Sequence, residues 1–153
     1  METKAPVEQR PIKILLVEDN PGDVILVREM LKRSRFPVHI GVARNGEEAL
    51  AYLRRKEPFA SIQLPDLVLL DLNLPRIGGQ EVLAEMRKEP DCGKIPVLIL
   101  TSSRNDLDIQ KAYQSEANFY LVKPMDLSEF PVLMEYLEKF WFENISQQKS
   151  KGK

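Results

Sequence analysis

The sequence of 153 residues contains a single cysteine, Cys92, and a single histidine, His39. One cysteine cannot form a disulfide bond within the chain. Cys92 stands in a turn-forming segment without a neighbouring histidine or cysteine, so we expect an ordinary loop thiol. His39 falls in a strand-like segment and has no partner ligand near it in the sequence, which favours a structural role. We therefore expect no metal site built from cysteine and histidine.

Long apolar runs are also missing. No stretch approaches the roughly 20 apolar residues that a membrane-spanning helix requires, and the polar segment 1–10 lacks the core of a signal peptide. The formal net charge of −1 offers no electrostatic reason to bind nucleic acid. The glycines form neither a GxGxxG nor a Walker-type loop. We therefore expect a cytoplasmic protein that enters no membrane and binds no nucleic acid directly.

The patterns that are present predict one α/β domain. Charged residues make up 29% of the chain and hydrophobic residues 43%, an ordinary balance for a soluble domain. Apolar strand signals alternate with helical patterns, which is typical of a parallel sheet with helical crossovers. We expect a folded domain over residues 11–145, with flexible tails at 1–10 and 146–153. The expected strands are 13–17, 38–43, 67–70, 97–100 and 119–122. The expected helices are 21–33, 45–55, 80–88, 106–115, and a last helix from Asp126 or Ser128 to about Glu143.

Five such units with right-handed crossovers predict a doubly wound, flavodoxin-like (βα)5 sandwich of three layers. The favoured strand order is 2-1-3-4-5. In this order the topological switch lies between the first and third strands, at their carboxyl ends, where ligands bind in folds of this kind.

Four of the expected strands end on side chains that carry chemistry. The first is followed by Glu18 and Asp19, the third by Asp71, the fourth by Thr101 and the fifth by Lys123. Because the carboxyl ends of parallel strands share one edge of the sheet, we expect the acids, the hydroxyl and the amine to converge.

The three carboxylates predict a site for a divalent cation. Clustered carboxylates raise one another's pKa, and a bound cation removes that conflict. Magnesium prefers oxygen ligands and keeps several waters, so Mg²⁺, or Mn²⁺ in its place, is the expected cofactor. Asp19 and Asp71 would supply oxygens directly, and Glu18 would act directly or through water. The backbone carbonyl of Asn73 is a further candidate ligand.

With a cation in place, Asp71 becomes a candidate nucleophile. A carboxylate that attacks phosphorus forms an acyl phosphate, and the cation would screen the repulsion between two anions. Lys123 would place a positive charge against the phosphoryl oxygens, and the Thr101 hydroxyl would donate a hydrogen bond to one of them. Phosphoryl transfer depends mainly on such positioning and charge stabilisation.

Two other functions remain open on these residues. One is a metal-dependent phosphohydrolase that uses an aspartyl phosphate. Enzymes of the haloacid-dehalogenase type usually carry a second aspartate as general acid two residues after the nucleophile, where this chain has Asn73. The other is a binding module that is never phosphorylated, which would have no need of the acid, hydroxyl and amine together.

Five segments of the chain resemble the receiver domains of two-component response regulators. They read ILLVEDN (14–20), LLDLNLP (69–75), GG (78–79), LTS (100–102) and YLVKP (120–124). The resemblance extends over about residues 12–140. It implies that Asp71 accepts a phosphoryl group from the phosphohistidine of a sensor histidine kinase, with self-catalysed transfer and dephosphorylation rather than enzymatic turnover.

The resemblance also implies roles for the neighbouring residues. Glu18 and Asp19 would be the acidic metal pair, with glutamate in place of the more familiar aspartate, and Lys123 would contact the phosphate. Thr101 and Tyr120 would form a coupled switch, in which the hydroxyl moves toward the phosphate and the ring turns inward. The peptide bond between Lys123 and Pro124 would be cis.

A narrower resemblance concerns the segments GKIPV (93–97), ANFY (117–120) and FWFE (140–143). They are similar to the small single-domain regulators that partner bacterial phytochrome histidine kinases. Only about ten polar residues follow the last expected helix. We therefore expect no fused DNA-binding domain, and a readout through interaction with a downstream protein.

The last helix carries a wider apolar arc than one sheet face requires. The stripe expected to cover the sheet consists of Phe130, Leu133, Leu137 and Phe140. The arc is widened to about half the circumference by Met134, Tyr136 and Trp141. The excess fits either packing at the end of the chain or a homodimer surface along the fourth helix, fifth strand and fifth helix, where receiver domains often pair. We favour the homodimer.

Overall fold

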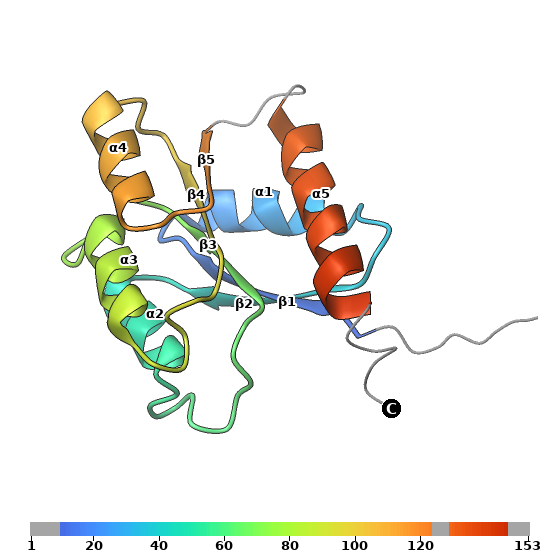
Figure 1. The fold of residues 1–153 in the computed structure, drawn as a ribbon, viewed down its shortest axis with the longest axis horizontal. Helices are drawn as coiled ribbons and strands as arrows, with labels where there is room; N and C mark the ends of the chain where they lie inside the picture. Colours follow the sequence, from blue (N-terminus) through green and yellow to red (C-terminus); the bar gives the residue numbers. More distant parts are fainter. Residues whose placement is uncertain (1–9, 124–128, 147–153) are drawn as a thin grey trace, which may run out of the picture.

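The computed structural model describes residues 10–123 and 129–146, and these form a parallel sheet between two layers of helices (Figure 1). The strand order is β2-β1-β3-β4-β5, which confirms the predicted flavodoxin-like α/β fold. The strands are β1 (Ile12–Val17), β2 (Val38–Ala43), β3 (Leu67–Leu70), β4 (Val97–Thr101) and β5 (Phe119–Val122). The helices are α1 (Pro21–Leu31), α2 (Gly46–Leu53), α3 (Gly79–Lys88), α4 (Asp106–Gln114), α5 (Glu129–Phe140) and the π-helix η1 (Trp141–Ser146).

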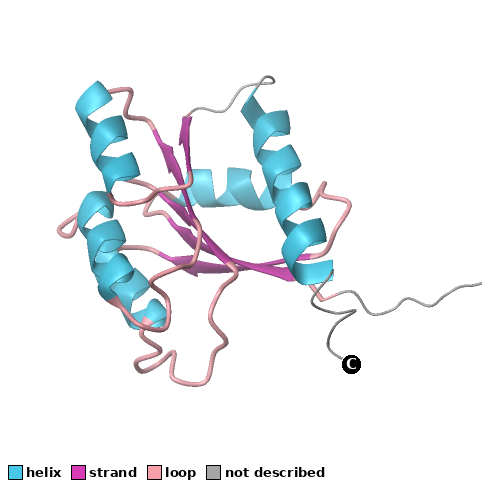
Figure 2. Ribbon diagram, in the orientation of Figure 1, coloured by secondary structure: helices cyan, strands magenta, loops and turns pink. Residues whose placement is uncertain are grey.

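Two apolar cores hold the sheet to its helices. Helices α1 and α5 cover one face, and α2, α3 and α4 cover the other (Figure 2). The four residues of β3 alternate between the two cores and are all fully buried. Burial of one such side chain contributes roughly 1.5–3 kcal/mol. The middle strand is therefore firmly anchored, and so is the residue that follows it, Asp71.

Asparagine side chains begin the two helices that follow β1 and β2. The Oδ1 atom of Asn20 accepts hydrogen bonds from the backbone of Gly22 and Asp23, at 2.8 and 3.1 Å. Asn45 accepts from the backbone of Glu48, at 2.7 Å. These caps satisfy backbone donors that a helix start leaves unpaired. The cap at Asn20 also fixes the first turn of α1, and with it the place of Asp23.

Cys92 differs from the loop thiol that the sequence predicts. The turn is present, but the side chain is 1% exposed and packs into the core under α2, α3 and α4. Its Sγ atom lies 3.9 Å from the carbonyl oxygen of Met86. Burial raises the pKa of the thiol above its ordinary value. The side chain therefore serves as a small apolar core residue.

The last helix also departs from its expected form. The α-helix ends at Phe140 and continues as the π-helix η1, and its predicted cap at Asp126 or Ser128 lies outside the described residues. Arg10, expected in the tail, pairs with Asp66 at 3.0 Å. In the parts of the chain that the structure describes, no helix is both long enough and apolar enough to cross a bilayer.

Part of the apolar excess of the last helix is used within the chain. The ring of Trp141 stacks on Phe36 at 6.0 Å between centroids, and its Nε1 atom donates to the carbonyl oxygen of Arg10 at 3.0 Å. The ring of Tyr136 stacks on Phe119 at 5.7 Å. Packing at the end of the chain therefore accounts for both rings. Val132 and Phe142 remain exposed.

Candidate functional site

The backbone of the sheet sets the acidic residues side by side. Leu70 of β3 lies opposite Val17 of β1 in the parallel register, and the backbone N–H of Asp71 donates to the Val17 carbonyl at 3.1 Å. The N–H of Glu18 donates in the same way to Ala43 at the end of β2, at 3.0 Å. Both acidic segments are thus held by the ladder at the point where their strands end.

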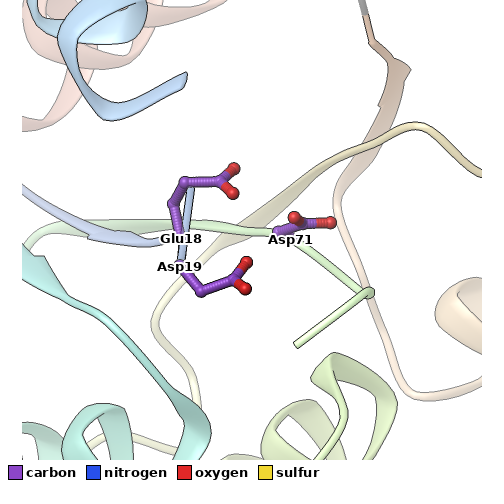
Figure 3. Close-up of side chains that lie close together, drawn as sticks. All are labelled: Glu18, Asp19 and Asp71. Atoms are coloured by element: carbon purple, nitrogen blue, oxygen red, sulfur yellow. The ribbon is translucent and has the colours of Figure 1, made fainter. Parts of the chain in front are cut away.

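Three carboxylates meet at this edge of the sheet. Glu18 and Asp19 come from the end of β1 and Asp71 from the end of β3 (Figure 3). Each offers an oxygen within 4.8 Å of the others. Glu18 and Asp71 are 2% and 5% exposed, and Asp19 is open to solvent. The convergence expected from the strand ends is present in the structure.

Lys123 joins this cluster from the end of β5. Its backbone N–H donates to the Thr101 carbonyl at 2.7 Å, which ties the ends of β4 and β5 together. Its Nζ atom lies 2.7 Å from Glu18 Oε1, 2.8 Å from Asp23 Oδ2 and 3.3 Å from Asp71 Oδ2. One ammonium group therefore serves three carboxylates.

Asp23 is a member of the site that reasoning from the strand ends missed. It lies in the first turn of α1 rather than at the end of a strand. The available signal was an acidic residue in the first turn of the helix directly after Glu18 and Asp19. Such residues usually interact with the positive end of the helix dipole, which does not by itself indicate a partner across the site.

Burial and the shared ammonium shift the pKa values of the site. Burial raises the pKa of Glu18 to about 6, and the hydrogen bond from Lys123 opposes that rise. For Lys123, burial lowers the pKa, but the hydrogen bonds to Asp23 and Glu18 outweigh burial and the net shift is upward. Lys123 therefore stays charged at any physiological pH. Glu18, with a pKa of about 6, titrates close to physiological pH.

Asn73 connects Asp71 with the end of β4. Its backbone N–H donates to Asp71 Oδ1 at 3.0 Å. Its side-chain Nδ2 donates to the hydroxyls of Thr101 and Ser102, each at 3.1 Å. The Thr101 side chain is completely buried. Thr101 therefore lies beside the acidic cluster, and its hydroxyl oxygen accepts from Asn73.

Tyr120 forms its hydrogen bond with the β4–α4 connection rather than with a carboxylate of the cluster. Its hydroxyl donates to the carbonyl oxygen of Ser103 at 3.0 Å, and burial raises its pKa. The Ser103 hydroxyl donates in turn to Asp108 on α4 at 2.6 Å. The ring is thus linked to the β4–α4 connection, which follows directly after Thr101. The peptide bond between Lys123 and Pro124, expected to be cis, lies outside the described residues.

The donor set fits a hard divalent cation. The cluster holds four carboxylates, three of which contact its single ammonium group, so it keeps an excess of negative charge. Carboxylate oxygens suit Mg²⁺ or Mn²⁺, and softer metals prefer thiolate or imidazole ligands. Glu18, Asp19 and Asp71 are the residues that would hold such a cation.

Comparison with known proteins identifies the family. The family described as "Response regulator receiver domain" matches residues 14–135. Response regulator Rcp1 of Synechocystis is 40% identical over 140 residues, which is 91% of this chain and 95% of Rcp1.

Two solved structures are similar in sequence and fold. The phosphorylated cyanobacterial phytochrome response regulator RcpA has a TM-score of 0.78 and 42% identity, over 87% of this chain and 95% of RcpA. The Mn²⁺-bound form of Rcp1 has a TM-score of 0.77 and 40% identity, over 88% and 97% of the two chains. From the family match and the extent of these similarities, the chain belongs to the response regulator receiver domains.

Proposed function

We propose that this protein is a response regulator that accepts a phosphoryl group on Asp71 from a sensor histidine kinase and signals through protein–protein contacts in the cytoplasm. The observation that carries the proposal is the position of Asp71, which is buried at the sheet edge and within reach of Glu18, Asp19 and Lys123. An acid that served only as a turn former would need none of these partners.

The chemistry follows from the residues around Asp71. A carboxylate oxygen attacks the phosphorus of a phosphohistidine, an O–P bond forms, and the P–N bond breaks as the imidazole leaves. Lys123 places its charge against the transferring group. The Thr101 hydroxyl is joined to Asp71 through the hydrogen bonds of Asn73 and would reorient toward the transferred group. A bound Mg²⁺ ion would screen the charge of donor and acceptor. Hydrolysis of the acyl phosphate on the same site resets the protein.

The Thr101 and Tyr120 side chains are proposed as the switch that reports phosphorylation. Both are linked to the β4–α4 connection, Thr101 through Asn73 and Tyr120 through the Ser103 carbonyl. A movement of the Thr101 hydroxyl toward a phosphoryl group would therefore disturb the segment that holds the Tyr120 ring. This supports a change at α4 and β5 on phosphorylation.

A phosphohydrolase is the weaker candidate for this site. It would need a general acid at Asn73, whose amide cannot transfer a proton in that role. In this structure both hydrogen bonds of that amide go to Thr101 and Ser102. Asn73 therefore connects the end of β3 with the end of β4 by hydrogen bonds.

The proposal is tested by incubation with acetyl phosphate and Mg²⁺, followed by intact-mass measurement. A response regulator gains one phosphoryl group as an acid-stable, base-labile adduct. Release of inorganic phosphate over many turnovers at enzymatic rates would favour the phosphohydrolase. Absence of any adduct would favour the third function, a binding module that is never phosphorylated.

The Mg²⁺ affinity is expected to fall as the pH drops through about 6. Burial raises the pKa of Glu18 to about 6, and a carboxylate must lose its proton to bind metal. At pH 5 a proton occupies Glu18 in about nine molecules of ten, so the apparent Kd should rise roughly tenfold from pH 7. Calorimetric titration at the two pH values measures this. Glu18→Gln should bind more weakly with a flatter pH dependence, and a wild-type affinity independent of pH would contradict the assignment.

We propose a phytochrome-type kinase as the partner. The support is the similarity to RcpA and Rcp1 over most of both chains, one of which is described as a phytochrome response regulator. Light-dependent transfer from a reconstituted bacterial phytochrome kinase to this protein tests the pathway. Transfer from unrelated kinases at equal rates would count against it.

We also propose a homodimer through α4, β5 and α5; in Figure 1 the edge strand β5 lies between the two helices. Leu107 and Tyr113 on α4 and Val132 on α5 are exposed apolar residues. Sedimentation of the protein with a phosphoryl mimic should show a dimer, and Leu107→Glu should shift it to monomer. Ile25→Glu on α1, similarly exposed but outside the surface of α4, β5 and α5, is the control. If the protein sediments only as a monomer at high concentration, both with and without the mimic, the proposed homodimer is refuted.

A further inference from the structure

Asp23 is a partner of Lys123 that the proposed phosphotransfer does not use. The two side chains form a contact of 2.8 Å between Asp23 Oδ2 and Lys123 Nζ, shorter than the 3.3 Å contact between Lys123 and Asp71. An ammonium group has three donors, and the contacts to Glu18, Asp23 and Asp71 occupy all three. Lys123 thus has no free donor for a new acceptor.

A phosphoryl group on Asp71 would compete for those donors. The acyl phosphate would carry a charge of roughly −2 where the Asp71 carboxylate carried −1, and it would add three strong acceptor oxygens. Glu18 is nearly buried, and its second oxygen is held by the backbone N–H of Asn20 at 3.2 Å. The Asp23 side chain is 32% exposed and can turn to water at little cost. Asp23 is therefore the exchangeable partner of the three.

We infer that Asp23 is a positioning residue that competes with the phosphoryl group for Lys123, and so limits how firmly the phosphorylated state is held. The inference rests on the proposed function of Asp71. Before phosphorylation, the Lys123 ammonium group contacts Asp23 on α1 as well as Glu18 and Asp71 at the sheet edge. After phosphorylation, its negative charge repels the phosphoryl oxygens and draws the ammonium away from them.

The test measures the affinity for beryllofluoride, a phosphoryl mimic, at saturating Mg²⁺. Asp23→Asn keeps the shape and an acceptor oxygen for Lys123 but removes the charge. The variant should bind beryllofluoride about five- to tenfold more tightly, because it removes a negative charge that repels the anionic mimic at a partly exposed site. Its acyl phosphate should also survive longer. Asp23→Ala, which removes the hydrogen bond as well, should change both quantities in the same direction.

The matched control is Glu29→Gln. It removes one negative charge from the same helix, but at a side chain that is paired with Lys32 at the surface. Its affinity for beryllofluoride should equal that of the wild type. A merely structural role for Asp23 would loosen the site and weaken binding, so the sign of the change separates the two explanations.

The outcomes also separate this inference from the proposed function. If the wild type binds beryllofluoride and both Asp23 variants bind it equally well or more weakly, the competition by Asp23 is refuted while the role of Asp71 stands. If the wild type binds no beryllofluoride and gains no phosphoryl group from acetyl phosphate, both proposals fall.

Discussion

Asp71→Asn is expected to gain no phosphoryl group from acetyl phosphate while it remains folded. The amide has nearly the size of the carboxylate, and its oxygen can still accept from the backbone N–H of Asn73, as Asp71 does now at 3.0 Å. Lys123 keeps its contacts to Glu18 and Asp23. A neutral amide nitrogen, however, is not the nucleophile that the transfer requires. We therefore expect complete loss of the adduct rather than slower formation.

Intact-mass measurement after incubation with acetyl phosphate and Mg²⁺ gives the result directly. Asp91→Asn is the matched control, because Asp91 lies exposed in the turn after α3 and pairs only loosely with Arg55, at 3.6 Å. This control should gain one phosphoryl group as the wild type does. A base-labile adduct on Asp71→Asn would mean that another residue is the acceptor.

Gly79→Ala is expected to destabilise the protein by about 3 kcal/mol, because the site leaves no space for a side chain. A Cβ atom at Gly79 would lie 2.3 Å from the carbonyl oxygen of Asp71 and 2.6 Å from the Cα atom of Leu72. Both are backbone atoms at the end of β3, so neither can turn away. The strand end that carries Asp71 would have to move, and phosphorylation should slow as well.

The neighbouring glycine supplies the control for this prediction. A Cβ atom at Gly78 would come no closer than 3.7 Å, to the carbonyl oxygen of Leu72. Gly78→Ala should therefore change the free energy of unfolding by no more than about 0.5 kcal/mol, the usual cost of alanine for glycine at a helix cap. Urea unfolding of both variants measures the difference. Equal stability of the two would show that α3 can shift to make space.

The strands were predictable because each is a short apolar run bounded by turn formers. The predicted limits of β2, β3 and β5 agree with the structure, and β1 and β4 are each one residue longer. Helix ends were less predictable. The first helix was expected to reach Arg33 but ends at Leu31, and the last becomes π-helical after Phe140. Helix ends depend on backbone partners in the folded protein, which the local sequence does not specify.

The candidate site was predictable to the extent that it follows from strand order. Once the sheet is parallel and ordered 2-1-3-4-5, Glu18, Asp19, Asp71 and Lys123 must come out at one edge. The structure places them there. The pairing of Lys123 with Asp23 was not predictable, because it depends on the angle at which α1 leaves the sheet.

The sequence by itself determined the fold, the strand order and the edge of the sheet that carries the chemistry. It did so because apolar periodicity and strand-end residues are local signals, and the rules of parallel sheets convert them into positions. Only the tertiary structure decided that Cys92 is buried, that Trp141 packs against Phe36, and that one ammonium group is shared by three carboxylates. Each of these depends on contacts between segments far apart in the chain, whose distances and angles no local pattern encodes.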